Sequence, residues 1–204
     1  MADGDQVTEE AFSQEVLAFF RLRLAKSRFA GRVEAAEKVK VLKDLTVGNV
    51  DGTWRLVAGV QQQDVVFYCP TDSFDYRDFK SKAMLDIKKY RGRRIHVPLA
   101  ICELKTGDKN MNTHVMITYS SIAEQLKTVF PHCQYHFVMR TNARSFTQET
   151  FLRHCKGFNR VFTEWSRDRD EVWFTIRQHL EWLERNGMIS KPVGRGERRV
   201  ASAG

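Results

Sequence analysis

Apolar residues recur at a spacing of three to four residues in three segments of the chain, and this period predicts amphipathic helices. The segments are residues 8–28, 112–130 and 168–187. The second is closed by Pro131, which cannot continue a helix. The third begins with acidic residues and stops at Gly187, as expected for a terminal helix.

Short apolar or alternating runs between these helices predict strands. They cover residues 53–60, 64–70, 96–105, 134–141 and 158–163. The segment 31–49 is ambiguous, and its first half predicts a helical piece that leads into a strand. The turn cluster GNVDG then joins this strand to residues 53–60 as a hairpin.

Two further segments complete the pattern. A short helix is expected to open at Ser145 or Thr147, and the charged residues 72–94 suit a partly exposed helix or lobe. The order of elements predicts an α/β protein with a mixed central β-sheet flanked by helices on both faces. We expect one domain over residues 8–190, a flexible leader at 1–7 and a basic, polar, disordered tail at 191–204.

Composition narrows the class of protein. The 204 residues carry 33 Lys and Arg against 25 Asp and Glu, a net charge of +8, so a polyanion such as nucleic acid is a candidate partner. The four cysteines form no CxxC pair, which predicts small buried side chains in a reducing compartment. The acidic N-terminus and the lack of a long apolar run predict no membrane association and an intracellular location, in the cytoplasm or the nucleoid or nucleus.

In the stretch HVPLAICELKTGDKN, charged residues lie at the end of a strand that its apolar residues predict to be buried. Glu103 and Lys105 are two residues apart, so they project from the same face, with Leu104 on the other. Buried charges are costly unless they are paired or bind a metal. Mg²⁺ prefers oxygen ligands and would need a second carboxylate. Asp64, which opens the predicted strand DVVFYCP, is the candidate donor. The alternative is a structural ion pair at a sheet edge.

The segments QQQDVVFYCP and VPLAICELKTG together resemble the core of the PD-(D/E)xK, or restriction-endonuclease-like, nucleases. In that family an Asp begins one strand and Glu-x-Lys ends the next. The order of predicted elements is similar over about residues 8–165. The resemblance implies an α-β-β-β-α-β core, to which the terminal helix is an addition. Gln63 stands where the family often has Pro.

The resemblance implies roles for these residues in metal-assisted phosphodiester hydrolysis. Asp64, Glu103 and the backbone carbonyl of Leu104 would bind one or two Mg²⁺ ions, for which Mn²⁺ would substitute. Lys105 would orient or deprotonate the attacking water, or stabilise the charge that develops on phosphorus. Asp72 is a rival to Asp64, which is preferred because it opens the strand.

The resemblance also implies further polar residues at the site. An acidic residue from the first helical region is expected, with Glu37 preferred over Glu15 and Glu34. The helix over 112–130 is expected to add Gln125 from a polar stripe, and His114 is a weaker possibility on it. The remaining histidines are expected to be structural or exposed.

Basic clusters predict the path of a phosphate backbone. The residues expected to contact nucleic acid are Arg91, Arg93, Arg94, Lys109, Arg140 and Arg144. The sequence therefore predicts a Mg²⁺-dependent DNA endonuclease of restriction, repair, junction, mobile-element or viral type. A homodimer or a partner protein that supplies specificity is expected. The alternatives are an RNA endonuclease of the same fold and a non-catalytic nucleic-acid-binding or assembly module.

Overall fold

The computed structural model describes residues 8–50, 52–75, 85–87, 94–107 and 111–190. The elements in chain order are α1 (Glu9–Ala25), β1 (Glu34–Val50), β2 (Thr53–Asp75), β3 (Leu85–Ile87), β4 (Arg94–Lys105), α3 (Thr113–Val129), β5 (Gln134–Met139), α4 (Gln148–His154), β6 (Arg160–Phe162) and α5 (Trp165–Arg185).

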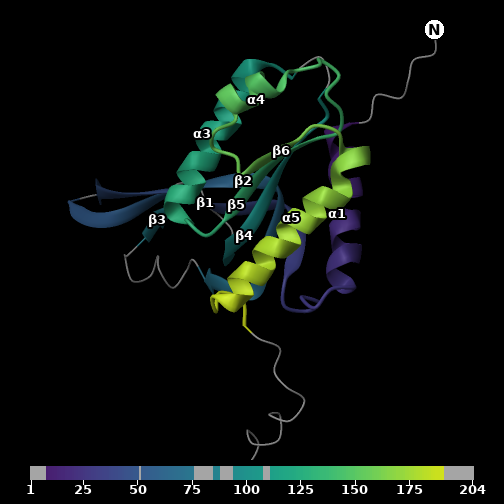
Figure 1. Ribbon diagram of the computed structural model, residues 1–204. Coiled ribbons are helices and arrows are strands. Elements are labelled where there is room, and N and C mark those ends of the chain that lie inside the picture. Colours follow the sequence, from purple (N-terminus) through teal and green to yellow (C-terminus); the bar gives the residue numbers. More distant parts are fainter. Residues whose placement is uncertain (1–7, 51, 76–84, 88–93, 108–110, 191–204) are drawn as a thin grey trace, which may run out of the picture.

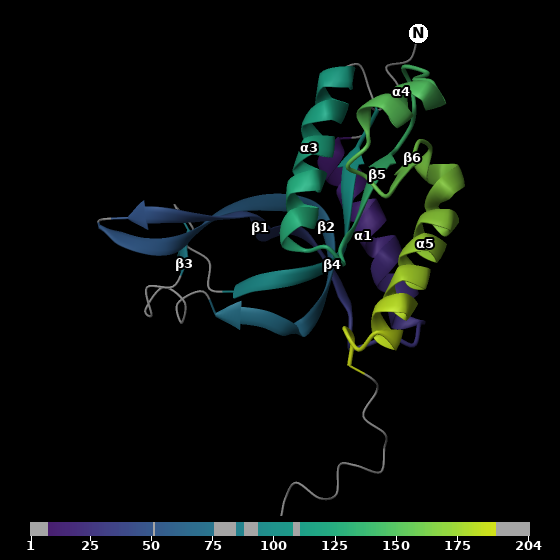
Figure 2. The same ribbon diagram turned by 60° about the vertical axis from the view of Figure 1, so that its left-hand side comes forward.

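The strands form one mixed sheet in the order β1-β2-β4-β5-β6, with β3 beside β2 (Figure 1). The pairs β1/β2 and β2/β4 are antiparallel, whereas β4, β5 and β6 are parallel. Helices α3 and α4 cover one face, and α1 and α5 cover the other (Figure 2). The predicted α/β class with a mixed, doubly covered sheet is confirmed.

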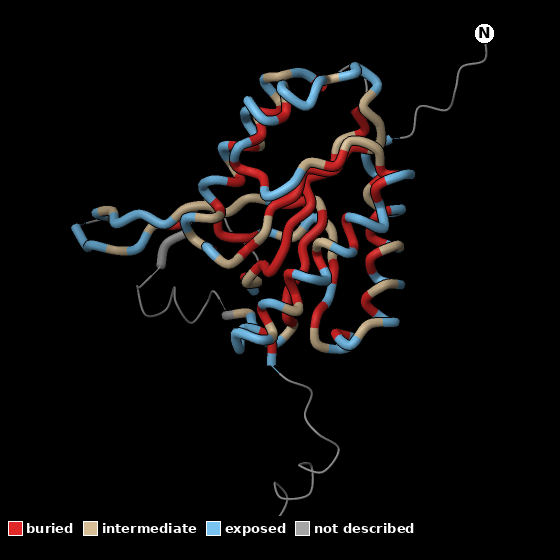
Figure 3. The backbone as a smooth tube through the Cα atoms, viewed as in Figure 1, coloured by how far each residue is buried: buried red, intermediate tan, exposed pale blue. Residues whose placement is uncertain are grey.

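The apolar side chains form two cores, one on each face of this sheet. One joins α1 and α5 to the sheet around Phe12, Phe20 and Trp165. The other lies beneath α3 and contains Met116 and Phe137. Buried residues are concentrated along the central strands (Figure 3). Because both faces are covered, a polar side chain on a central strand is buried unless it lies near a strand end.

Several predicted elements are confirmed. Helix α1 begins after Thr8, whose hydroxyl accepts from the Ala11 amide at 3.1 Å. Helices α3 and α5 match the two other periodic segments. Of the two openings expected for the short helix, Thr147 is correct, because its hydroxyl caps α4 by accepting from the Thr150 amide at 3.2 Å.

The helical piece predicted in the first half of 31–49 is wrong. Strand β1 begins at Glu34 and pairs with β2 from Glu34↔Tyr68 to Val50↔Thr53. The residues EAAEK favour a helix by propensity, but long-range pairing with an apolar strand overrides this weak preference.

The two strands predicted at 53–60 and 64–70 are a single strand, β2. The polar run between them continues the ladder, where Gln61, Gln62 and Gln63 pair with Val41, Lys40 and Val39. Asp64 therefore lies inside β2 and does not open a strand. Pro70 does not end the strand either, because it falls where the pairing with β4 skips from Tyr68 to Ser73 and needs no ladder N–H.

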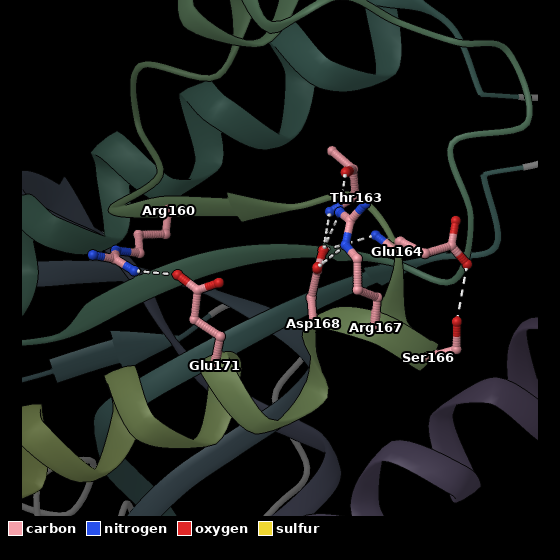
Figure 4. A network of polar contacts seen from close by, with 7 residues as sticks. All are labelled: Arg160, Thr163, Glu164, Ser166, Arg167, Asp168 and Glu171. Atoms are coloured by element: carbon pink, nitrogen blue, oxygen red, sulfur yellow. Dashed lines mark hydrogen bonds and ion pairs between the residues drawn. The ribbon is translucent and has the colours of Figure 1, made fainter.

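A polar network fixes the start of α5 against the end of β6 (Figure 4). The Asp168 carboxylate accepts from the backbone N–H groups of Thr163 at 3.1 Å and Glu164 at 3.0 Å. Arg167 donates to the same carboxylate at 2.7 Å. Burial opposes the charge of Asp168, but these donors lower its pKa overall. The network satisfies backbone donors that the helix end would leave open.

Some predictions fall outside the described residues: the leader 1–7, the tail 191–204 and most of the charged segment 72–94. Within the described helices, none is long and apolar enough to cross a membrane. The four cysteines are free and buried, as predicted; they are Cys69, Cys102, Cys133 and Cys155.

Candidate active site

The candidate site lies where β2 and β4 separate. The last regular pair between these strands is Val65↔Cys102. Beyond it, the Asp64 carboxylate accepts from the backbone N–H of Leu104 at 2.8 Å, which replaces a ladder hydrogen bond. Glu103, only 3% exposed, lies in this region at the carboxyl end of β4.

Three oxygen atoms converge on the ammonium of Lys105. Its Nζ donates to Glu103 Oε1 at 2.8 Å and to the Leu104 carbonyl at 2.9 Å. The Asp64 Oδ2 atom lies 3.9 Å from the same nitrogen. The two carboxylates and the carbonyl that the resemblance names as metal ligands therefore surround one positive charge.

Burial and charge together set the protonation of this cluster. Burial raises the pKa of Glu103 to about 8, although Lys105 acts against this shift. Burial also disfavours the charged form of Lys105, but Glu103 and Asp64 outweigh it and the pKa of Lys105 is raised. The neighbouring acidic groups thus favour the charged form of Lys105.

Two buried side chains that the sequence did not single out support Glu103. The Tyr135 hydroxyl on β5 donates to Gln63 Oε1 and lies 3.3 Å from Glu103 Oε2. Tyr135 is fully buried and Gln63 is 1% exposed. In the sequence, Gln63 was noted only because it stands where the nuclease family often has Pro. Its contact with Glu103 through Tyr135 depends on the order of strands, which no local pattern reveals.

A small cavity opens beside Lys105. It has a volume of about 190 Å³ and is lined by Lys105, Thr106, Gly107, Tyr119 and Glu9, with Met111 and Val115. The Lys105 Nζ atom lies 4.2 Å from the centre of the Tyr119 ring, a cation–π contact. Glu9, in the first turn of α1, is the acidic residue of the first helix that lines this cavity. Nothing in the sequence assigns Glu9 to the site, because acidic residues are common in the first turn of any helix, where they interact favourably with the helix dipole.

The acidic residues favoured from the sequence have other partners. Glu37 accepts from Ser13 at 3.1 Å and from Gln14 at 2.6 Å, which joins β1 to α1. Of its two rivals, Glu15 accepts from the Trp165 indole at 2.8 Å and Glu34 from the Tyr68 hydroxyl at 3.1 Å. Among the described residues, these three make their hydrogen bonds away from Lys105 and Asp64.

The polar stripe of α3 faces solvent. Its members His114, Thr118, Ser121 and Gln125 are exposed, while Tyr119 of the same helix reaches Lys105. The rival acid Asp72 is also exposed and accepts from Thr71 at 3.1 Å. It lies next to Ser73, which pairs with His96 near the start of β4, whereas Glu103 and Lys105 lie at the other end of that strand. Asp64 is therefore the carboxylate that accompanies Glu103.

The basic residues expected to contact nucleic acid are only partly described. The Arg140 amide donates to the Lys105 carbonyl at 2.8 Å, so Arg140 directly adjoins the site. Arg94 and Arg144 are exposed. Arg91, Arg93 and Lys109 lie outside the described residues.

The donor set suits a hard divalent cation. Carboxylate and carbonyl oxygens are the protein ligands that Mg²⁺ takes, and Asp64, Glu103 and Leu104 bring three such oxygens together around the Lys105 ammonium. Within the described ranges, no group of three or more His, Cys, Asp or Glu is arranged to bind a metal. An ion here would thus take its remaining ligands from water and phosphate, as Mg²⁺ commonly does.

Compared with models of known protein families and with curated proteins, the sequence matches none of them.

Proposed function

We propose that this protein is a Mg²⁺-dependent endonuclease that hydrolyses phosphodiester bonds of DNA, on a restriction-endonuclease-like core. One observation carries the proposal: oxygen atoms of Asp64, Glu103 and the Leu104 carbonyl converge on the ammonium of Lys105 at the end of β4. The order α1-β1-β2-β4-α3-β5, with β4 and β5 parallel across a helical crossover, supports the resemblance to this nuclease core.

The residues divide the chemistry between them. Asp64 and Glu103 would hold the metal with the Leu104 carbonyl. Mg²⁺ bound there would polarise the phosphate and make a bound water more acidic. Lys105 would stabilise the negative charge that develops on the phosphate oxygens. Tyr135 and Gln63 would fix Glu103 in place from the buried side.

Cleavage assays test this proposal directly. Plasmid DNA, single-stranded DNA and RNA would each be incubated with the protein in Mg²⁺, Mn²⁺ or EDTA. We expect metal-dependent cleavage of DNA that Asp64→Ala, Glu103→Gln and Lys105→Ala each reduce by at least about a hundredfold.

The matched control is Glu124→Gln, which changes an exposed glutamate on α3 and should leave cleavage unchanged. Cleavage that persists in Glu103→Gln would refute the assignment. Loss of cleavage in Asp72→Ala, with full activity in Asp64→Ala, would show that the wrong acid has been chosen. Preference for RNA over DNA would correct the substrate and keep the chemistry.

A further inference from the structure

A second, larger cavity lies between α4 and the outer strand β6. Its volume is about 600 Å³, in the range of sites that bind small organic molecules. The rings of Phe146, Phe151 and Phe158 contribute to its wall, and Val161 of β6 lines it as well. Leu152 also lines it and is 70% exposed, which places it at the mouth. No member of the candidate active site lines this cavity.

The cavity runs along β6 from Phe158, before the strand, to Thr163, after it, and its Thr163 end lies at the same edge of the sheet as the candidate active site. Strands β4, β5 and β6 are parallel, so their carboxyl ends lie side by side (Figure 1). The loop after β5 connects the two places: Thr141 donates to the Thr106 carbonyl at 3.3 Å, and the next residue, Asn142, lines the cavity. Two strand spacings separate β4 from β6, about 10 Å. A stacked nucleic-acid strand covers this distance in about three nucleotides.

The polar groups of the cavity suit a nucleotide. Gln148 brings an amide group to the lining, which contains no Asp or Glu. Two further amides line it but already have partners. Asn142 bonds to the Phe146 backbone through both its oxygen and its nitrogen, and Asn159 Oδ1 accepts from the Tyr135 backbone N–H. Lys156 is exposed there and supplies positive charge. Arg160 also lines the cavity, but its guanidinium bonds to Glu171 of α5 at 2.9 Å (Figure 4). Aromatic walls, amides and a cation are the groups that stack, read and neutralise a nucleotide.

An extended peptide fits this place less well. Peptides that add a strand to a sheet depend on a run of backbone hydrogen bonds along the edge. The edge strand β6 has only three residues, Arg160–Phe162, so it offers few such bonds. The neighbouring carboxylate and lysine cluster favours a phosphodiester ligand over a peptide.

We propose that this cavity binds an unpaired base of the nucleic acid, within about three nucleotides of the cleaved bond. The inference rests on the proposed nuclease function and specifies its substrate. A base inside a duplex is stacked and paired, so it cannot enter a cavity without leaving the helix. The substrate is therefore DNA with a single-stranded region beside the cleavage site, such as an overhang or a junction, and not a continuous duplex.

Binding measured without cleavage tests the proposal. Fluorescence anisotropy of the Glu103→Gln variant in EDTA would compare labelled single-stranded DNA, a blunt duplex and a duplex with an overhang. We expect both probes with unpaired bases to bind at least about tenfold more tightly than the blunt duplex. Lys156→Glu and Leu152→Trp, which alter the wall and the mouth, should each reduce that binding by about tenfold.

Two controls change the same residue types elsewhere. Lys26→Glu alters net charge equally at an exposed lysine, and Leu22→Trp enlarges an exposed leucine of α1; both should leave the preference for unpaired bases intact. Equal affinity for duplex and single strand would overturn the proposal. So would oligonucleotide binding that Lys156→Glu and Leu152→Trp leave unchanged, as expected if the cavity receives a peptide.

The outcome is separable from that of the proposed function. If wild-type protein cleaves DNA but the cavity variants bind like their controls, the cavity proposal alone fails. If the cavity variants lose binding but no nucleic acid is cleaved in Mg²⁺, the nuclease assignment fails and the base-binding cavity stands.

Discussion

At the scale of single residues, the candidate site depends on buried polar groups that hold one another. Glu103, Tyr135 and Gln63 are almost wholly removed from solvent, and the Tyr135 hydroxyl joins the other two. A buried polar group that loses its partner keeps the cost of desolvation without the gain from a hydrogen bond. The network therefore stabilises the carboxylate position and makes it sensitive to small changes.

Removal of one hydroxyl tests this network. Tyr135→Phe would leave Gln63 Oε1 without its donor, so we expect the free energy of unfolding to fall by about 1–3 kcal/mol. Urea unfolding measures the change. The matched control is Tyr68→Phe, which should cost less because its acceptor Glu34 is exposed and water can replace the hydroxyl. Equal losses in the two variants would argue against a special role for Tyr135.

A buried histidine makes stability depend on pH. His136 is fully buried, and neither ring nitrogen has a hydrogen-bond partner among the described residues. Burial, with nearby His179, Lys127 and Arg160, lowers its pKa to about 3. Between this value and the ordinary pKa of about 6.5, the unfolded chain binds a proton that the folded protein does not. Stability is therefore lost as the pH falls through this range.

We expect His136 alone to remove about 2 kcal/mol of unfolding free energy between pH 6.5 and pH 5. Burial also lowers the pKa of His96, His132 and His179. These three histidines therefore also make stability depend on pH, and a variant of His136 is needed to isolate its own effect. Urea unfolding of His136→Leu should show a shallower loss over this range than the wild type. His114→Leu, at an exposed position, should keep the wild-type slope. Identical slopes in all three proteins would contradict the assignment.

At the scale of elements, the end of β4 is shaped by one glycine. Gly107 follows the strand with a φ of +78°, and an added Cβ would lie 1.6 Å from the Thr141 carbonyl oxygen. Thr141 itself is tied to β4, because its amide donates to the Thr106 carbonyl. A side chain at this position would therefore push apart the two strand ends that border the candidate site.

Two glycine variants separate backbone strain from this overlap. Gly31 has a similar φ of +73°, but an added Cβ there meets nothing within 4 Å. Gly31→Ala should cost only the strain of a left-handed backbone, about 1–2 kcal/mol. Gly107→Ala should cost clearly more, at least about 3 kcal/mol, and should impair metal binding. Thermal unfolding measures both variants, and equal costs would contradict this description of the strand end.

Prediction of elements from the sequence succeeded where periodicity was long and failed where pairing was non-local. The three long helices follow from their apolar spacing alone. The first residues of β1 do not, because their propensity is helical and only the partner strand makes them extended. The same partner explains why the three glutamines before Asp64 are strand residues and not a loop.

At the scale of the whole molecule, the topology assembles a site that the sequence shows only in part. Glu103 and Lys105 could be predicted as neighbours, because a strand places residues two apart on one face. Asp64 was predicted for the wrong local reason, since it lies within a long strand, yet that strand brings it to Leu104. Tyr135, Gln63 and Glu9 could not be predicted, because their approach depends on which strands and helices are neighbours.

The central claim is that Asp64, Glu103 and the Leu104 carbonyl form a cation site that serves phosphodiester hydrolysis. Diffraction from crystals soaked in Mn²⁺, recorded where manganese scatters anomalously, tests it most directly. We expect an anomalous peak in contact with Asp64 and Glu103, with Lys105 displaced from the centre of the oxygen atoms, and no such peak in Glu103→Gln crystals. A wild-type crystal with no peak at this position, from a protein that cleaves DNA in Mn²⁺, would show that these residues are not the metal site.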